Sequence, residues 1–398
     1  MMTKRSLLVV AALSLLAASP LLAQKNKEPK RPKLDAAADT NDWNAYYAYG
    51  LSKLDDRPDE AERAFYWASR LNPLVPDPLF AEWVAHWMND RHMYDYLLGD
   101  ERTATSKDAI RNDSLVYRAT LKNPFVMRAL ERRMWDKLDE EIRVETGGRE
   151  SLFRNAAANP WVAGWMAYTR GQMGAAVDKF REAAEKNPKE LSYHLDLADA
   201  LFHMGRADSA VAQLNYVIGE MKQRDLKRLV VWYNSKAQLE YRVGMVLMAA
   251  QRLDDAKAAF GRALAEDLSY YMAHARLGDI ALAQHDTTAA LNEYGAAAEI
   301  NTDDATLRVG YGAALLAARR AAEAADQFRK AVEIDPYYAA ARYNLAIALD
   351  ADGKLVEAFK AYKDYLPYAS RQDQRQVAFA NERINQLTIV VKNGGSGQ

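Results

Sequence analysis

The sequence predicts an all-α fold, an α-solenoid of stacked antiparallel helix pairs. Small residues recur at a fixed place in the repeating unit: Ala176, Ala210, Ala256, Ala290, Ala324 and Ala358. Their successive spacings are 34, 46, 34, 34 and 34 residues, and 46 is 34 plus an insertion of 12. A fixed period of about 20–50 residues is typical of solenoids, in which each unit packs only on its neighbours.

Other positions keep the same register. A large apolar residue lies four residues after each alanine: Phe180, Leu214, Phe260, Tyr294, Phe328 and Tyr362. A small residue lies twelve residues before each alanine: Gly164, Ala198, Gly244, Gly278, Gly312 and Ala346. Around Phe328 the apolar residues recur at helical spacing and form one stripe. Each unit is therefore predicted to be two amphipathic helices, with small residues at their crossing and an aromatic ring between units.

These positions resemble the tetratricopeptide repeat (TPR) family, in which glycine, alanine, phenylalanine and alanine follow one another in this register. Pro188 and Pro336 match the proline that closes its repeat. The chain departs from the family where His194, Glu240, His274 and Arg308 replace the first-helix tryptophan, and where Leu268 and Thr302 replace the proline. The resemblance implies a right-handed superhelix that binds proteins and is usually not an enzyme.

The resemblance also implies a binding face, because ligands of the family commonly lie against the first helix of each pair. Carried onto this register, the partner-binding groove consists of Trp161, Trp165, Tyr168, Asp199, Phe202, Tyr241, Met245, Met248, Met272, Asp279, Tyr343 and Asp350. The lysines and asparagines of the family's carboxylate clamp are missing. Aromatic anchors and adaptable methionines predict a groove for an extended or helical segment of a protein partner. The alternative is that some of these side chains fill a tight superhelix.

Residues 1–23 predict a secretory signal peptide, with Lys4 and Arg5 ahead of an apolar run and cleavage after Ala23. The run is short for a membrane span of about 20 residues. No integral membrane segment is therefore expected after cleavage, and an uncleaved anchor is the alternative. With the alanine-rich repeats, this signal favours a bacterial protein that is periplasmic or secreted.

Residues 24–40 are rich in lysine, arginine and proline, which predicts a basic disordered linker. Such a linker is either a spacer or a segment attracted to an anionic surface.

Residues 41–160 predict a degenerate TPR-like region ahead of the array at 161–369. Gly50, Ala61 and Phe65 carry a first repeat. Further helices are expected over Pro78–Met88, Asp108–Leu121 and Phe125–Val144. We interpret them as divergent helix pairs, and a distinct helical module is the alternative.

Three features complete the array. The insertion at 219–236 predicts lengthened helices on either side of a tight turn at Gln223–Asp225. Residues 370–388 predict an amphipathic capping helix, which terminal repeats need to cover their apolar face. Residues 389–398 are expected to be a disordered tail.

Composition excludes several classes of site. The chain has no cysteine, hence no disulfide and no thiolate chemistry, and its net charge of −1 gives no basis for binding nucleic acid. No catalytic motif, cofactor site or metal site is predicted. Glu82 and His86 lie one helical turn apart without a third ligand, so a solvated pair is expected there.

We therefore interpret the protein as a non-catalytic scaffold or adaptor of the bacterial cell envelope. Two alternatives stay open. The first is an enzyme or enzyme accessory with a pocket in residues 74–160, lined by Trp83, His86, Trp87 and His92. The second is a self-assembling structural protein, a homo-oligomer joined through exposed apolar ends.

Overall fold

The computed structural model describes residues 28–89, 107–149, 151, 153–154, 158–226 and 235–394. Every regular element in these ranges is a helix, which confirms the predicted all-α fold. The predicted signal peptide and the middle of the predicted insertion lie outside the described residues. None of the helices in these ranges combines the length and apolar character needed to cross a membrane.

The chain divides into two compact units. The first comprises residues 1–30, 52–63 and 79–267, and the second comprises residues 31–51, 64–78 and 268–398. The N-terminal helices α1 (Trp43–Lys53) and α2 (Pro58–Leu71) contribute to both.

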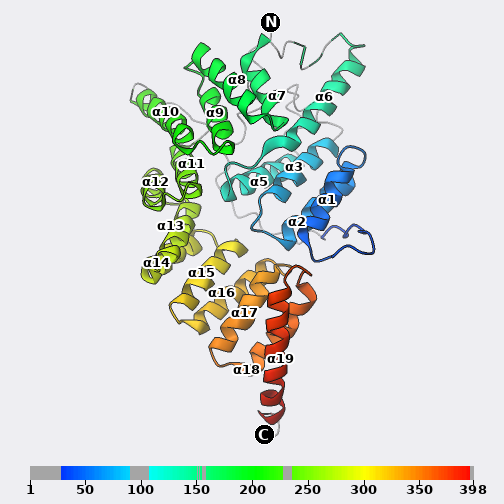
Figure 1. Ribbon diagram of the computed structural model, residues 1–398, viewed down its shortest axis with the longest axis vertical. Coiled ribbons are helices and arrows are strands. Elements are labelled where there is room, and N and C mark those ends of the chain that lie inside the picture. The colour runs from blue at the N-terminus through cyan, green and yellow to red at the C-terminus, as the bar shows by residue number, and fades with distance from the viewer. Residues whose placement is uncertain are drawn as a thin grey trace. The chain divides into compact units, whose positions relative to one another are not determined.

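The first unit continues through a series of helices that Figure 1 shows in blue to green. They are α3 (Asp77–Asn89), α5 (Lys107–Lys122), the 3₁₀ helix η1 (Arg128–Leu130), α6 (Glu131–Glu145), α7 (Pro160–Thr169), α8 (Met173–Lys186), α9 (Leu191–His203), α10 (Ala207–Asp225), α11 (Lys236–Ala249) and α12 (Leu253–Glu266).

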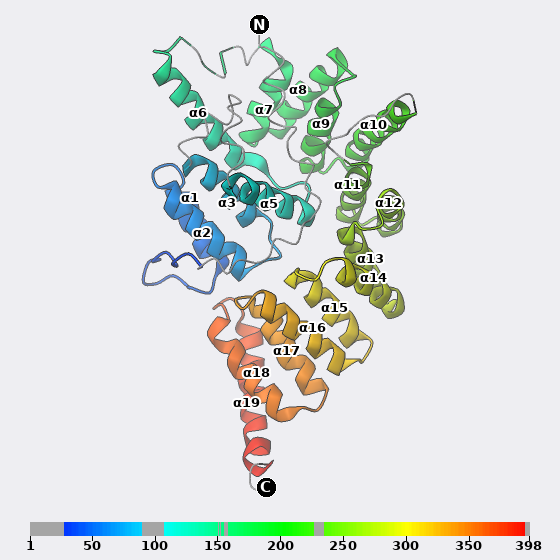
Figure 2. The ribbon, with the colours of Figure 1, turned by 180° about the vertical axis from the view of Figure 1, so that it is seen from behind.

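The second unit contains the C-terminal repeats, which Figure 2 shows from behind in yellow to red. They are α13 (Tyr271–Ala283), α14 (Thr287–Ile300), α15 (Ala305–Ala317), α16 (Ala321–Ile334), α17 (Ala339–Ala351), α18 (Leu355–Tyr365), η3 (Leu366–Tyr368) and α19 (Gln374–Gly394).

Within each unit, helices pack mainly on the next helix along the chain, in the pairs α7 with α8, α9 with α10, α11 with α12, α13 with α14, α15 with α16 and α17 with α18. Where the small residue predicted at the helix crossing is a glycine, it lies under the aromatic ring of the same repeat, as at Gly164, Gly244, Gly278 and Gly312. In the repeat formed by α15 and α16, a Cβ added to Gly312 would lie 2.6 Å from the ring of Phe328. Because only a glycine permits this approach, the ring is fully buried between the helices.

The segment expected to be a disordered linker is ordered from Arg31 onward. The guanidinium carbon of Arg31 lies 4.3 Å from the ring centroid of Trp67. Further along, the carboxylate of Asp39 accepts a hydrogen bond of 3.0 Å from the hydroxyl of Ser370. The prediction of disorder is wrong here because the polar residues of this stretch find partners elsewhere in the second unit, to which they belong.

The helix expected over Phe125–Val144 begins only at Glu131, after the short η1. Residues 123–127 are not helical. Pro124 has no N–H to donate, and the side-chain oxygen of Asn123 accepts instead from the backbone N–H of Phe125 at 2.9 Å. This turn stops the helical path, so the helix prediction is wrong for these residues.

The tight turn expected at Gln223–Asp225 is also wrong, because α10 continues through these residues. Met221 is buried and holds the additional turn of helix on the unit. The guanidinium of Arg224 donates to the backbone carbonyl of Lys189 at 2.9 Å.

The capping helix is longer than expected. α19 packs on α18 and extends to Gly394, so the tail predicted to be disordered over 389–398 is helical as far as residue 394. Ala380 and Leu387 are buried against the last repeat, while Ile389 is exposed.

Candidate functional site on the first helices of the first unit

The candidate site is the first-helix face of the first unit, which we define as the side of α7, α9 and α11 that carries Trp165, Asp199, Phe202 and Arg242. Asp196, Asp199 and His203 are spaced three and four residues apart on α9, so they share one side of that helix. Trp165 and Arg242 come from the first helices of the flanking pairs. The repeat architecture thus aligns aromatic and charged side chains from three helices.

A segment of the same chain lies on this face. We call residues 121–131 the covering segment. The ring of Phe125 stacks on the ring of Phe202, with centroids 4.1 Å apart and planes inclined by 23°. The guanidinium carbon of Arg242 lies 5.0 Å from the Phe125 centroid, and the Tyr241 hydroxyl donates to the backbone carbonyl of Leu121 at 3.0 Å. Aromatic stacking, a cation–π contact and a backbone hydrogen bond therefore hold this segment.

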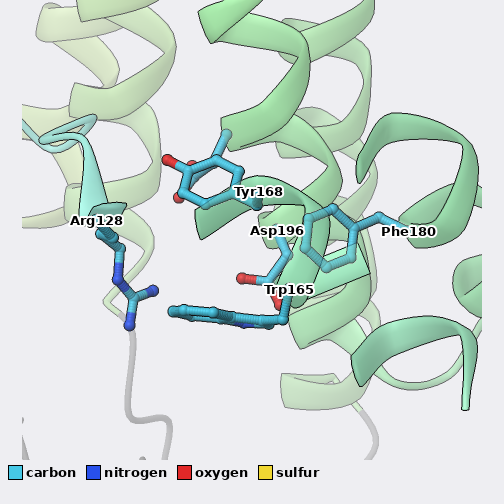
Figure 3. Close-up of a pocket in the computed structure, with 6 residues that line it drawn as sticks. Arg128, Trp165, Tyr168, Phe180 and Asp196 are labelled. Carbon is cyan, nitrogen blue, oxygen red and sulfur yellow. The ribbon is translucent and has the colours of Figure 1, made fainter. Parts of the chain in front are cut away.

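Arg128 occupies a small pocket on the same face. Its guanidinium lies beside the ring of Trp165, as the close-up in Figure 3 shows. The guanidinium carbon is 4.6 Å from the ring centroid. The pocket is lined by Arg128, Trp165, Tyr168, Phe180, Asp196 and Asp199. Its cavity volume is about 10 Å³, the space of about one water molecule. Arg128 therefore nearly fills the pocket.

Two aspartates give the pocket its charge. Burial raises the pKa of Asp196 to about 6, although the indole N–H of Trp161 donates to this carboxylate at 2.7 Å and Arg128 attracts it. Burial also raises the pKa of Asp199, and the positive charges of Arg242 and Arg128 act against it. Arg242 forms an ion pair with Asp199. The two carboxylates of this face are thus desolvated, and the positive charges of Arg128 and Arg242 stabilise their ionised forms.

Arg128 is itself held by a buried acid. Its Nε and one terminal nitrogen donate to Glu131 at 2.5 and 3.1 Å, and Glu131 is only 2% exposed. Burial lowers the pKa of Arg128, but Glu131 and the two aspartates outweigh it and the net shift is upward. Arg128 therefore remains a cation throughout the physiological pH range.

Three buried polar atoms of the site have no hydrogen-bond partner among the described residues. They are the hydroxyl of Tyr168, Nε2 of His203 and Nε of Arg242. The rings of Tyr168 and His203 lie 5.7 Å apart. Tyr168 is 4% exposed and lines the arginine pocket. A buried hydroxyl without a partner is costly, so the pocket has an unused polar contact.

The structure separates the predicted groove residues into two sets. Tyr168, Tyr241 and Met272 are buried. They fill the interior of the superhelix, as the alternative to a binding role predicted. The others are partly exposed: Trp161, Trp165, Asp199, Phe202, Met245, Met248, Asp279, Tyr343 and Asp350. Of these, Trp165, Asp199 and Phe202 are brought together in the first unit.

In the second unit, the predicted groove residues have partners of their own. Asp350 accepts from Nε of Arg383 in α19 at 2.8 Å and from the Tyr362 hydroxyl at 3.2 Å. The ring of Tyr343 lies 5.2 Å from that of Tyr365. The binding role predicted for these positions stays a prediction.

Sequence reasoning missed the residues that complete the site: Phe125, Arg128, Asp196 and Arg242. One signal was present, because Asp196 and Asp199 lie on one side of a largely apolar helix. Two acids there require cations nearby. Arg242 in the next repeat supplies one, but nothing in the sequence singles out Arg128.

The alternative pocket in residues 74–160 stays a prediction, but the solvated pair expected of Glu82 and His86 is wrong. His86 pairs through Nδ1 with Glu62 at 3.0 Å, and Glu82 is buried. His92 lies outside the described residues. In the described ranges, no group of three or more histidine, aspartate or glutamate residues is arranged to hold a metal ion.

Family sequence profiles described as tetratricopeptide repeat match residues 167–231, 241–306, 276–339 and 328–360. Residues 167–231 and 241–360 therefore belong to the tetratricopeptide repeat family. TPR proteins are typically non-catalytic, and the TPR fold implies protein or peptide partners. The family resemblance inferred from the repeat register is thereby confirmed.

Several solved TPR structures are similar to this chain. YrrB, described as a TPR protein with an unusual peptide-binding site, is 21% identical, with coverage of 52% of this chain and 100% of that one and a TM-score of 0.41. The MamA protein is 18% identical, with coverage of 46% and 93% and a TM-score of 0.38. The C-terminal part of a TPR protein from Cytophaga hutchinsonii is 15% identical, with coverage of 58% and 88% and a TM-score of 0.48. The comparison with curated protein sequences yields no match.

Proposed function

We propose that the protein is a non-catalytic adaptor of the bacterial cell envelope, which binds an extended segment of a partner protein on its first-helix face. The observation that carries this proposal is the covering segment, because its non-helical residues 123–127 are held on that face. Phe125 is 2% exposed there, as completely buried as a core residue. A surface that holds a non-helical turn of its own chain has the shape and chemistry to hold a similar segment from another chain.

The contacts on this face are of the kind that dominate peptide recognition. Phe202 provides an aromatic surface for stacking, and Trp165 provides a second one beneath a guanidinium. Asp199 and Arg242 form an ion pair beside them. Buried aromatic and arginine contacts supply most of the binding energy in protein interfaces.

Export through residues 1–23 places this adaptor in the periplasm or outside the cell. The support is the basic start and the apolar run of the sequence, followed by alanine at the expected cleavage point. The intact mass of protein isolated from the envelope fraction tests this proposal. A first residue of Gln24 is expected, and an intact N-terminus would show that residues 1–23 are retained as an anchor.

The binding proposal is tested by affinity capture from the envelope fraction, with residues 24–398 as bait and a Trp165→Ala bait beside it. Tyr241 is unsuitable as a second probe because it is only 1% exposed, and its loss would damage the core. Tyr216→Ala is the matched control, since this ring is 39% exposed on the second helix α10.

A partner captured by the wild-type and Tyr216→Ala baits, but lost with the Trp165→Ala bait at unchanged helicity, supports the proposal. A partner retained by all three baits would place binding elsewhere on the chain. The absence of any partner, together with a dimer in light scattering, would favour self-assembly instead.

A further inference from the structure

The covering segment makes only some of the hydrogen bonds that the polar groups of the first-helix face could form. Both hydrogen bonds that Arg128 makes among the described residues go to Glu131, which belongs to the covering segment itself. Asp196 and Asp199 attract Arg128 through charge alone, and neither receives a hydrogen bond from it. The arginine pocket therefore keeps two carboxylates that could each accept a direct bond from a guanidinium.

The pocket also keeps a hydroxyl without a partner, whose oxygen can accept a hydrogen bond from a guanidinium. The Tyr168 hydroxyl is buried, lines the pocket and has no hydrogen-bond partner among the described residues. The cavity of about 10 Å³ beside it is too small for a further side chain while Arg128 is in place. A ligand that uses these groups must therefore replace Arg128.

We propose that the covering segment occupies in cis a recognition site for an arginine-bearing segment of a partner protein, and that the partner displaces it. The partner is a segment that adopts a similar turn, with an aromatic residue three positions before the arginine, the spacing of Phe125 and Arg128. Its aromatic ring stacks on Phe202 and its guanidinium enters the pocket formed by Trp165, Asp196 and Asp199. This inference rests on the proposed adaptor function and names the chemistry of its partner.

Arginine fits this pocket better than lysine does. A planar guanidinium stacks on the indole of Trp165 and can donate to two carboxylates at once. When the covering segment leaves, Arg128 and Glu131 leave together. Asp196, Asp199 and Arg242 stay on the face, and two carboxylates beside one guanidinium give it a net negative charge. Charge complementarity thus favours a cationic segment.

The cis arrangement lowers the affinity of the wild-type chain for such a partner. A tethered segment acts at an effective concentration in the millimolar range. A separate peptide with the same contacts must compete with it, so weakening the covering segment should strengthen binding in trans.

The test uses a fluorescent peptide with the sequence of Leu121–Glu131 and blocked ends, titrated against residues 24–398 and followed by anisotropy. The hosts are the wild type, Arg128→Gln, and the double variant Phe125→Ala with Arg128→Gln. We expect the peptide to bind Arg128→Gln at least about tenfold more tightly than the wild type, because the cis competitor is weakened.

Two matched controls define the recognised chemistry. A peptide whose arginine is replaced by glutamine should lose at least about tenfold in affinity for the Arg128→Gln host. An Asp199→Asn change added to that host should also weaken the arginine peptide, but not the glutamine peptide.

The proposal is overturned if the folded Arg128→Gln host, checked by circular dichroism, binds the peptide no better than the wild type or fails to bind it. Equal binding of the arginine and glutamine peptides would overturn it as well. The peptide titration and the capture experiment test different claims, so one can fail while the other succeeds. A partner lost with Trp165→Ala would still support the adaptor if the peptide fails, and peptide binding without a captured partner would leave only the envelope role unsupported.

Discussion

A Cβ atom added to Gly244 would lie 2.4 Å from the ring of Phe260, well inside van der Waals contact. This approach predicts that Gly244→Ala is destabilising. Overpacking costs about 1–3 kcal/mol, and the better helix propensity of alanine returns only about 1 kcal/mol. Urea unfolding followed by helicity should show a lower midpoint.

Gly261→Ala is the control for that change. Gly261 lies in α12, next to Phe260, and a Cβ there has no atom within 4 Å. It should stabilise the chain by about 0.5–1 kcal/mol through helix propensity alone. If both alanines raise the midpoint, the Gly244 contact is looser than the structure shows.

The contact between Gly244 and Phe260 follows from the sequence, whereas the arginine pocket does not. The two residues belong to one helix pair, so the repeat register alone places one under the other. Arg128 and Asp196 lie in different parts of the chain, and no periodicity relates them. Their place in one pocket depends on the turn at Asn123 that interrupts the expected helix, a local hydrogen bond that a hydrophobic pattern cannot indicate.

The stacking of Phe125 on Phe202 predicts measurable coupling between them. A double-mutant cycle with Phe125→Leu and Phe202→Leu should give a coupling free energy of about 0.5–1.5 kcal/mol in urea unfolding. Leucine keeps most of the buried volume, so each single variant is expected to fold. Strict additivity of the two changes would show that the rings do not interact and that the covering segment is not held by stacking.

The raised pKa of Asp196 predicts an unusual pH dependence. Its pKa in the folded chain is about 6, above the ordinary value of 3.8, so between about pH 4 and 6 the folded chain holds a proton that the unfolded chain releases. The contribution of this group to stability therefore falls as pH rises through that window. At pH 7 the cost is on the order of 2–3 kcal/mol.

Asp196→Asn should remove this penalty while it keeps the acceptor for the Trp161 indole. The variant should be more stable than the wild type at pH 7, and the difference should vanish near pH 4. Asp178→Asn is the control, since that side chain is 75% exposed. A difference between Asp196→Asn and the wild type that is independent of pH would contradict the assignment.

The hydrogen bonds that join Asp39 to Ser370 and Arg371 within the second unit predict a change in proteolysis. Burial alone raises the pKa of Asp39, but hydrogen bonds from the backbone N–H groups of Arg371 and Asn41 and from the Ser370 hydroxyl lower it overall. The carboxylate form is thus favoured in the folded chain, and its contribution is lost as pH falls below about 4.

Removing that carboxylate with Asp39→Ala should release residues 31–40. Charge-assisted hydrogen bonds contribute about 1.5–3 kcal/mol, so trypsin should cleave after Lys33 about tenfold faster. Asp35→Ala removes the same charge from an exposed side chain and should leave the rate unchanged. Equal rates for both variants would mean that the hydrogen bonds of Asp39 do not hold the segment.

The turn between the helices of each repeat places one residue in the left-handed region of backbone conformation. A glycine occupies this position in three repeats. In the others it is occupied by Gln251, His285 and Arg319, with φ of 60–61°. This conformation costs a residue with a Cβ roughly 1 kcal/mol or more relative to glycine. His285→Gly should therefore stabilise the second unit by about 1 kcal/mol, measured as a higher midpoint in urea.

His285→Ala separates the backbone effect from the loss of the imidazole, because alanine removes the ring but keeps the Cβ. It should leave the midpoint near that of the wild type. Gly353→Ala tests the same conformation in the opposite direction, since Gly353 has a φ of 77° and open space around it. It should destabilise by about 1 kcal/mol. If His285→Gly and His285→Ala shift the midpoint equally, the gain comes from the side chain and the turn carries no strain.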